Sequence, residues 1–155
     1  MRVYLVIIDE TEEARKALRF AANRAAATGG SVHILALVQP QNFNAFGGVQ
    51  ATIEQEARDR AEAIAHSAAG ALMDEDGRMP TIAVKVGEGS AMVREYLADH
   101  PEVAALVLGS AEGGSPGPLV THFSHGAGNL PCPVYILPGA ISNEEIDRLS
   151  LGRSD

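Results

Sequence analysis

Five short apolar runs alternate along the chain with longer stretches of helical periodicity, and this alternation restricts the fold more than any other feature. A continuous run rich in β-branched residues suits a strand that is covered on both faces of a parallel sheet. The predicted strands are Val3–Ile8, Ser31–Val38, Thr81–Val86, 103–108 and Val134–Leu137. Strands that alternate with helices predict a parallel sheet with helices on both faces and ligands at the carboxyl ends of the strands.

The stretches between these runs carry the signals that begin and end helices. Asp9 and Thr11 offer side-chain oxygens to the free amides of a first helical turn, and Gly29-Gly30 provides a left-handed stop. Further helices are predicted over 52–73, 90–98 and 119–125. Alanine fills these segments and aromatic residues make up only 5% of the chain, which favours helices packed closely through small side chains.

The length of 155 residues fits one domain with a single core. We predict a domain over 1–140, followed by a tail over 141–155 that is partly helical. In this tail, Ser142 and Glu145 stand at the spacing of a capping box, in which two side chains satisfy the first amides of a helix.

The charge and cysteine content of the chain narrow its partners. A formal net charge of −8 would repel a polyanion, so nucleic acid is not expected to bind. The one cysteine, Cys132, allows neither an intramolecular disulfide nor a multi-cysteine metal site, and its place before an apolar run predicts a structural thiol. The first strand follows Met1 directly, without a secretory leader, and the apolar runs are too short to cross a membrane. We therefore expect a cytoplasmic protein.

The glycine-rich segment 109–117, after the fourth strand, is the best candidate ligand site. In a parallel sheet, the loops after strands one and four meet where the strand order reverses, so this segment and Asp9 should be neighbours. Its glycines would let backbone amides approach an anion, and the next helix would add its dipole. The alternative is a plain surface loop, because the segment matches neither the Walker pattern nor the dinucleotide fingerprint.

The chain resembles the universal stress protein family over residues 3–137. The resemblance rests on VIID at 6–9, VLGS at 107–110 and CPVYIL at 132–137. It implies a Rossmann-like, adenine nucleotide α-hydrolase-like three-layer α/β/α fold with a five-stranded parallel sheet. It also implies a dimer and, in many members, ATP or AMP, with or without Mg²⁺, at a loop of pattern Gly-x-x-Gly-x9-Gly-Ser/Thr.

The glycine-rich segment only partly follows the pattern of that family. Gly109 matches the first glycine, but the second position is Glu112, and Gly113 comes one residue late. The final Gly-Ser position falls on 122–123 or 120–121, depending on the direction of counting, and Pro116 and Pro118 stiffen the loop. A carboxylate a few ångströms from a triphosphate costs roughly 1 kcal/mol or more, which favours AMP or no ligand over ATP.

The resemblance implies a set of nucleotide-binding positions. They are Asp9, Leu37, Val38, Gly109, Ser110, Gly113, Gly114, Gly117 and Thr121. Asp9 is expected to cap the first helix. Two interpretations remain open for it, a cap alone or a cap that also contacts the ligand. Thr121 or Ser124 would supply a hydroxyl beside the phosphates. Two loop aromatics, Phe43 and Phe46, would cover a base or anchor their loop on the core.

Other classes of function have weaker support. His122 and His125 lie three residues apart on a predicted helix, but a zinc site needs further ligands. We find no activated nucleophile, paired carboxylates or general base, so at most a weak ATPase activity is expected. A receiver-like phosphoacceptor domain would need an aspartate after strand three and a lysine after strand five, where Gly87 and Pro138 stand.

The final strand, Val134–Leu137, predicts how two copies would associate. An uncovered apolar edge invites pairing with another chain. We therefore expect a homodimer through this strand, which either responds to a nucleotide or acts through protein contacts without one.

Overall fold

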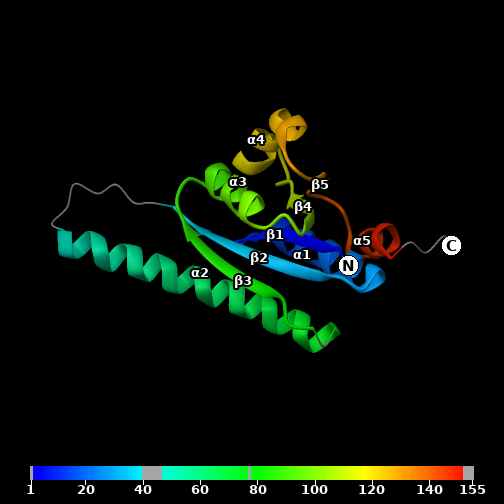
Figure 1. The fold of residues 1–155 in the computed structure, drawn as a ribbon, viewed down its shortest axis with the longest axis horizontal. Coiled ribbons are helices and arrows are strands. Elements are labelled where there is room, and N and C mark those ends of the chain that lie inside the picture. Colours follow the sequence, from blue (N-terminus) through cyan, green and yellow to red (C-terminus); the bar gives the residue numbers. More distant parts are fainter. Residues whose placement is uncertain (1, 40–46, 77, 152–155) are drawn as a thin grey trace.

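The computed structural model describes residues 2–39, 47–76 and 78–151. Its five strands pair in parallel in the order β3-β2-β1-β4-β5, with helices on both faces, which confirms the predicted fold class (Figure 1). The strands are β1 (Val3–Ile8), β2 (Ser31–Val38), β3 (Thr81–Val86), β4 (Val103–Gly109) and β5 (Val134–Leu137). The helices are α1 (Glu12–Thr28), α2 (Gly47–Asp76), α3 (Gly89–Asp99), α4 (Pro118–Gly126) and α5 (Asn143–Ser150), with a 3-10 turn, η1 (Ala127–Asn129).

The direction of strand addition reverses at β1. In its register, Val6 pairs with Ile34 of β2 on one side and with Val107 of β4 on the other. Helices α1, α2 and α5 cover one face of the sheet, and α3 and α4 cover the other, so each face has its own apolar core. Cys132 is half-buried against the α3–α4 core, and this burial raises the pKa of its thiol, as expected of a structural cysteine.

Helix α1 begins and ends where the sequence predicts. The hydroxyl of Thr11 accepts a hydrogen bond from the amide of Ala14, and Gly29 ends the helix in the left-handed conformation with φ of 68°. Its small residues Ala14, Ala17 and Ala21 are buried against the sheet. This alanine face lets the helix lie close to the strands.

Helix α2 departs from the prediction in length. It begins at Gly47 rather than near residue 52, and its 30 residues span about 45 Å, whereas the strands of six to eight residues that it covers span about 20–27 Å. Figure 1 shows the amino-terminal part of α2 projecting past the carboxyl ends of the strands. Helices α1 and α2 make few direct contacts and leave a groove between them, while the buried alanines of both helices pack into the core over the sheet. Phe43 and Phe46 lie outside the described residues.

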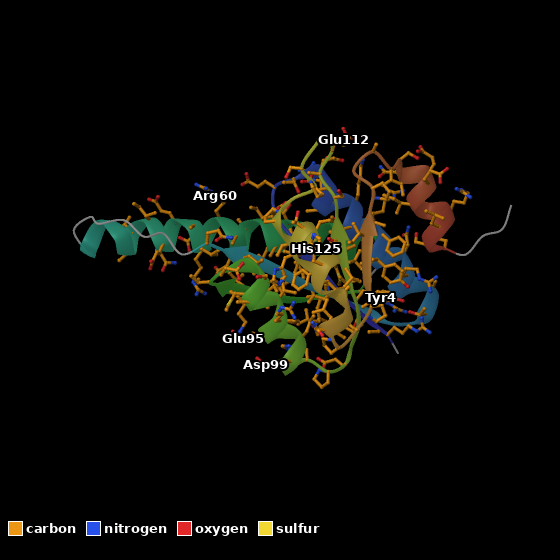
Figure 2. All side chains as sticks on the ribbon, turned by 90° about the horizontal axis from the view of Figure 1, so that it is seen from above. Tyr4, Arg60, Glu95, Asp99, Glu112 and His125 are labelled. Atoms are coloured by element: carbon orange, nitrogen blue, oxygen red, sulfur yellow. The ribbon has the colours of Figure 1, made fainter. Side chains whose placement is uncertain are left out.

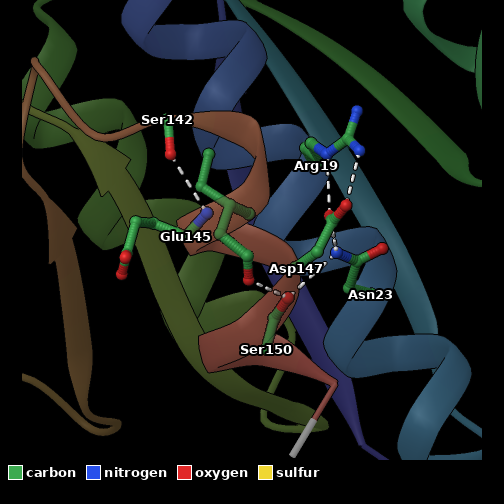
Figure 3. Close-up of polar contacts among 7 residues, drawn as sticks. Arg19, Asn23, Ser142, Glu145, Asp147 and Ser150 are labelled. Atoms are coloured by element: carbon green, nitrogen blue, oxygen red, sulfur yellow. Dashed lines mark hydrogen bonds and ion pairs between the residues drawn. The ribbon is translucent and has the colours of Figure 1, made fainter. Parts of the chain in front are cut away.

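Helix α5 packs against α1 through polar contacts and one apolar side chain (Figure 3). Two nitrogens of Arg19 donate to the Asp147 carboxylate at 2.8 and 2.7 Å, and Asn23 donates to Asp147 and to Ser150 at 2.9 Å each. The hydrogen bonds from Arg19 hold the pKa of Asp147 below its usual value. Ile146 is fully buried in the core that α1 and α2 share. The tail helix is therefore fastened to the domain.

The predicted cap of this tail helix forms in part. The amide of Glu145 donates to the hydroxyl of Ser142 at 3.1 Å, while the Glu145 carboxylate pairs with Arg148 instead of returning to the helix start. Across the described ranges, no helix is both long and apolar enough to span a membrane.

A buried polar cluster lies between β2 and α3. Nδ1 of His33 lies 2.7 Å from the hydroxyl of Tyr96, and the His100 ring stacks on the Tyr96 ring with 3.9 Å between their centroids. His33 is only 8% exposed. Burial lowers the pKa of His33, His100 adds to this effect, and the Glu102 carboxylate opposes it. The imidazole is therefore held neutral near neutral pH.

This cluster predicts acid-sensitive stability. Folding leaves His33 with fewer bound protons than in the unfolded chain, so its stabilising contribution is complete above the ordinary pKa of 6.5 and is lost as the pH falls below that value. We expect the melting temperature of the wild type to fall more between about pH 7.5 and about pH 5 than that of His33→Gln. The control is His66→Gln, at an exposed position of α2, which should keep the wild-type slope. Equal slopes for all three proteins would contradict the assignment.

Candidate functional site

The loops after β1 and β4 meet at the carboxyl edge of the sheet. A Cβ atom on Gly109, at the end of β4, would lie 2.1 Å from the carbonyl oxygen of Glu13 in the first turn of α1. Only glycine permits this approach, because that distance is far inside van der Waals contact. The β4–α4 loop therefore begins directly beside the start of α1.

Asp9 supports the start of α1 from two residues before the cap. Its Oδ1 atom accepts hydrogen bonds from both the amide, at 2.8 Å, and the hydroxyl of Thr11. Thr11, rather than Asp9, is the capping residue. Asp9 is exposed, and its second carboxylate oxygen accepts none of the hydrogen bonds found among the described residues.

The base of the glycine-rich segment is fastened to its surroundings. The amide of Ser110 donates to the Leu137 carbonyl at 2.9 Å, and the amide of Ala111 donates to the Pro116 carbonyl at 3.0 Å, which closes the loop. The turn after β5 packs against this base, because a Cβ on Gly139 would lie 2.5 Å from the Ser110 carbonyl oxygen. The backbone amide of Ser110 is thus already engaged and cannot bind a phosphate without losing this bond.

The tip of the segment is open to solvent. Gly113 and Gly117 have φ angles of 101° and 110°, which other residues rarely adopt. A Cβ on Gly114 would meet nothing within 4 Å. Figure 2 shows Glu112 at the periphery of the molecule, with its carboxylate pointing away from the ribbon. The carboxylate thus stands at the outside of the loop rather than against its backbone.

The start of α4 presents free backbone amides. Gly117 occupies the capping position without a side chain to satisfy them, and Pro118 follows at the first helical position. The first backbone hydrogen bond of the helix runs from the amide of Thr121 to the Gly117 carbonyl at 3.0 Å. Thr121 is exposed one turn into the helix, whereas the hydroxyl of Ser124 donates to the Thr121 carbonyl at 3.1 Å. Of the two candidate hydroxyls, only that of Thr121 has no hydrogen bond among the described residues.

An apolar wall stands next to this helix start. A Cβ on the buried Gly89 would lie 3.5 Å from Leu37 at the end of β2 and 3.4 Å from Leu119 in α4. The three residues come from different elements and meet at the carboxyl edge. Val38 points to the opposite face, into the core under α1 and α2, and its carbonyl accepts the amide of Gly87 at 3.0 Å. Leu37 thus lies at the candidate site, whereas Val38 is buried in the core.

Glu88, at this same edge, was not predicted as a site residue from the sequence. The Glu88 carboxylate caps α3 by accepting hydrogen bonds from the hydroxyl of Ser90 at 2.7 Å and the amide of Ala91 at 2.8 Å. These hydrogen bonds lower the pKa of Glu88, and the nearby His122 contributes to the same shift. Acidic residues inside a Gly-x-Gly turn before a helix are a recognisable capping signal. Their electrostatic contact with another helix has no sequence signal.

The predicted histidine pair does not form a metal centre. Nε2 of His122 lies 3.3 Å from an Arg94 nitrogen, and the Arg94 guanidinium lies over the Phe123 ring at 5.4 Å from its centroid. Within the part of the chain that the structure describes, no group of three or more histidine, cysteine or acidic side chains is placed to hold a metal ion. His122 instead links α4 to α3.

The tight contact at Gly109 predicts a stability difference within the loop. Gly109→Ala should destabilise the fold by about 1–3 kcal/mol, because the new methyl group meets backbone that cannot move aside. Gly114→Ala, in the same loop but in open space, should change the free energy of unfolding little. Chemical denaturation measures both. An equal effect of the two substitutions would show that β4 and α1 are not held together at this contact.

Comparison with known proteins places the chain in a family. The family model of the universal stress protein family matches residues 1–138. The universal stress protein UspA from Lactobacillus plantarum superposes with a TM-score of 0.75 at 18% identity, over 88% of this chain and 97% of that one. No curated protein sequence matches the chain significantly.

Two further similar structures contain nucleotides. The universal stress protein from Archaeoglobus fulgidus in complex with dAMP has a TM-score of 0.58 at 17% identity, over 88% of this chain and 96% of that one. A universal stress protein family protein from Arabidopsis thaliana with AMP bound has a TM-score of 0.61 at 14% identity, over 89% of this chain and 92% of that one. At these identities the structural likeness shows the fold, and the family model covers nearly the whole chain. The chain therefore belongs to the universal stress protein family.

Proposed function

We propose that this protein is a stress-response regulator that binds an adenine nucleotide between the start of α4 and the loop after β1. The observation that carries the proposal is the meeting of Leu37, Gly89 and Leu119 beside the uncapped amides of α4. An apolar wall next to free amides suits a ligand with a flat base and a negatively charged group. Related proteins of the same fold are known with AMP and dAMP bound.

Each part of a nucleotide has a matching group at this edge. The base would lie against the half-buried side chains of Leu37 and Leu119. The free carboxylate oxygen of Asp9 would accept from ribose hydroxyls. The phosphate would bind the first amides of α4 and the Thr121 hydroxyl, with the open glycines 113, 114 and 117 of the loop tip around it.

The charges of the site favour a monophosphate over a triphosphate. Asp9 and Glu88 are exposed carboxylates at the same edge, and His122 is already close to Glu88. A triphosphate brings several more negative charges than AMP and would need a cation such as Mg²⁺ to offset this repulsion. We therefore propose AMP as the preferred ligand, with ATP binding weakly and depending on Mg²⁺.

A protein of this family without nucleotide binding is the alternative. The engaged amide of Ser110 and the displaced second glycine of the loop favour it, because both reduce the number of phosphate donors. In that case the protein would act through protein contacts alone. A cytoplasmic location, predicted from the sequence, accommodates either role.

A titration with matched variants separates the two functions. We expect AMP to raise the melting temperature and to bind in calorimetry, with ATP weaker unless Mg²⁺ is present. Thr121→Val removes the side-chain hydroxyl that is proposed to bind the phosphate, and it keeps the shape of the side chain. This substitution should weaken AMP binding roughly tenfold. Ser124→Ala is the control, because that hydroxyl is used within the helix. A flat titration of the wild type with both nucleotides would establish the alternative.

We also propose a homodimer through β5. This strand pairs with β4 on one side only, and Tyr135 and Ile136 on it are each 38% exposed. An exposed apolar edge strand is a template for pairing with another copy. Tyr135 additionally contacts Phe20 of α1, with 5.2 Å between ring centroids, which holds the edge in place.

The dimer predicts a difference between the two edges of the sheet. Ile136→Lys should shift the mass in light scattering from dimer to monomer, because it buries a charge in the interface. Val86→Lys places the same charge at a comparably exposed apolar residue, 39% exposed, on the opposite edge strand β3 and should leave the dimer intact. A monomeric wild type, or dissociation by Val86→Lys alone, would be evidence against pairing through β5.

A further inference from the structure

The groove between α1 and α2 is a large concave feature, and of the residues in the nucleotide proposal only Asp9 lines it. It encloses about 730 Å³, which is within the range of about 300–1,000 Å³ found for small-molecule sites. Its floor is formed by the buried apolar side chains of Ile8, Leu18 and Leu72, with Ile64 and Ala68 half-buried above them. The groove lies on the α1–α2 face, whereas Leu37, Gly89 and Leu119 lie on the α3–α4 side.

The groove exists because neither helix fills the space between them. Ala63, Ser67 and Ala71 line the α2 wall, and their side chains are too short to reach α1. All three are exposed, although they stand above an apolar floor. A strip of apolar surface is therefore left open to solvent along α2. A concave site with an apolar lining and a few polar groups suits a small ligand.

Four cations and three acids line the groove, so its formal charge is slightly positive in a protein whose net charge is −8. The sequence has 12 lysines and arginines and a net charge of −8, yet four of these cations line this one groove. They are Arg15, Lys16, Arg19 and Arg60. Three acids, Asp9, Glu10 and Glu12, also line the groove. Glu12 is paired with Arg15 and Asp9 accepts hydrogen bonds from Thr11, so two of them already have partners.

Arg60 is the cation best placed to meet a ligand. Its guanidinium takes part in no ion pair or hydrogen bond found among the described residues, and the residue is exposed. Figure 2 shows the Arg60 side chain standing out from α2. Lys16, in contrast, donates to the Gly139 carbonyl at 2.8 Å, and Arg19 pairs with Asp147. An anion at the Arg60 end of the groove would gain a partner without breaking an existing contact.

We propose that this groove binds an amphipathic anion, specifically a chain carboxylate of the fatty-acid class. The hydrocarbon chain lies along the floor between Leu18 and Leu72, and the carboxylate pairs with Arg60. The α2 wall from residue 60 to residue 72 is roughly 18 Å long, which accommodates a chain of medium length. Apart from Asp9, the groove shares no lining residue with the proposed nucleotide site, and the proposal does not depend on that site.

The shape of the groove favours an extended chain over a helix from a partner protein. The floor residues Ile8, Leu18 and Leu72 are only 5%, 9% and 6% exposed, so little of their surface can be reached from outside. A helix is about 10–12 Å wide with its side chains and is poorly suited to contact such nearly covered residues. A single hydrocarbon chain reaches the floor and buries the apolar surface that the two helices leave open.

Calorimetric titration with dodecanoate, below its micelle concentration, tests the proposal. We expect saturable binding with one site per chain. Dodecanol, which has the same chain and no charge, should bind at least several-fold more weakly, and acetate should not bind. Ser67→Phe fills the groove from an exposed position and should abolish binding, while His66→Phe, the neighbouring exposed position outside the lining, should not.

The charged end of the site has its own matched pair of variants. Arg60→Gln should weaken dodecanoate binding roughly tenfold, because it removes a charge-assisted contact to the carboxylate. Arg58→Gln removes the same charge from the same helix outside the lining and should leave the affinity unchanged. The melting temperatures of these variants show whether they fold. AMP binding measured on Ser67→Phe should equal that of the wild type, so failure of one site is distinguishable from failure of the other.

Three results would overturn the proposal. The first is no saturable binding of dodecanoate by the wild type, and the second is unchanged binding by Ser67→Phe. The third is an equal loss in Arg60→Gln and Arg58→Gln, which would indicate a general charge effect. Binding of an acidic amphipathic helical peptide without binding of dodecanoate would make the groove a protein-docking surface and would also refute the assignment.

Discussion

The close approach of β4 to α1 at Gly109 is the contact on which the rest of the carboxyl edge depends. Because Gly109 packs directly on the Glu13 carbonyl, the strand and the helix that flank the reversal of strand order cannot separate. The base of the β4–α4 loop is then fastened on its other side by the Ser110 bond to β5. A loop that is fixed at its base and free at its tip can present amides in a constant position while its glycines adapt to a ligand.

The fold could be predicted from the sequence because burial on both faces leaves a plain signal. The strands β1, β2, β3 and β5 begin and end where their apolar runs do, and the reversal at β1 follows from the connection rules of parallel sheets. The start of α2 was missed because Gly47-Gly48 resembles a loop, although glycine is tolerated near a helix start. The groove was missed because alanine-rich helices indicate close packing without indicating which neighbour they pack against. Here α1 uses its alanines against the sheet.

The site could be predicted only in part, and the physical reason is that sequence shows strand ends but not side-chain convergence. Placing Leu37 and the glycine-rich segment at one edge needs only the topology of the sheet. The apolar wall also needs Gly89 and Leu119, which meet Leu37 only once α3 and α4 have packed. The same holds for His33, whose partner Tyr96 is 63 residues away along the chain. The Glu112 carboxylate, which by sequence position suggested repulsion of a phosphate, stands at the outside of its loop (Figure 2).

The turn between β1 and α1 connects the two proposed ligand sites. Asp9 lines the groove beside α2 and also holds Thr11, while the helix turn that Thr11 caps packs against Gly109 at the other site. A ligand that binds one position of this turn better than another would be coupled to the second site, and by thermodynamic linkage the effect would be equal in both directions. The close-packed sheet beneath the turn deforms little. The turn itself is held by a few hydrogen bonds at exposed positions, and it is the element that connects the two sites most directly.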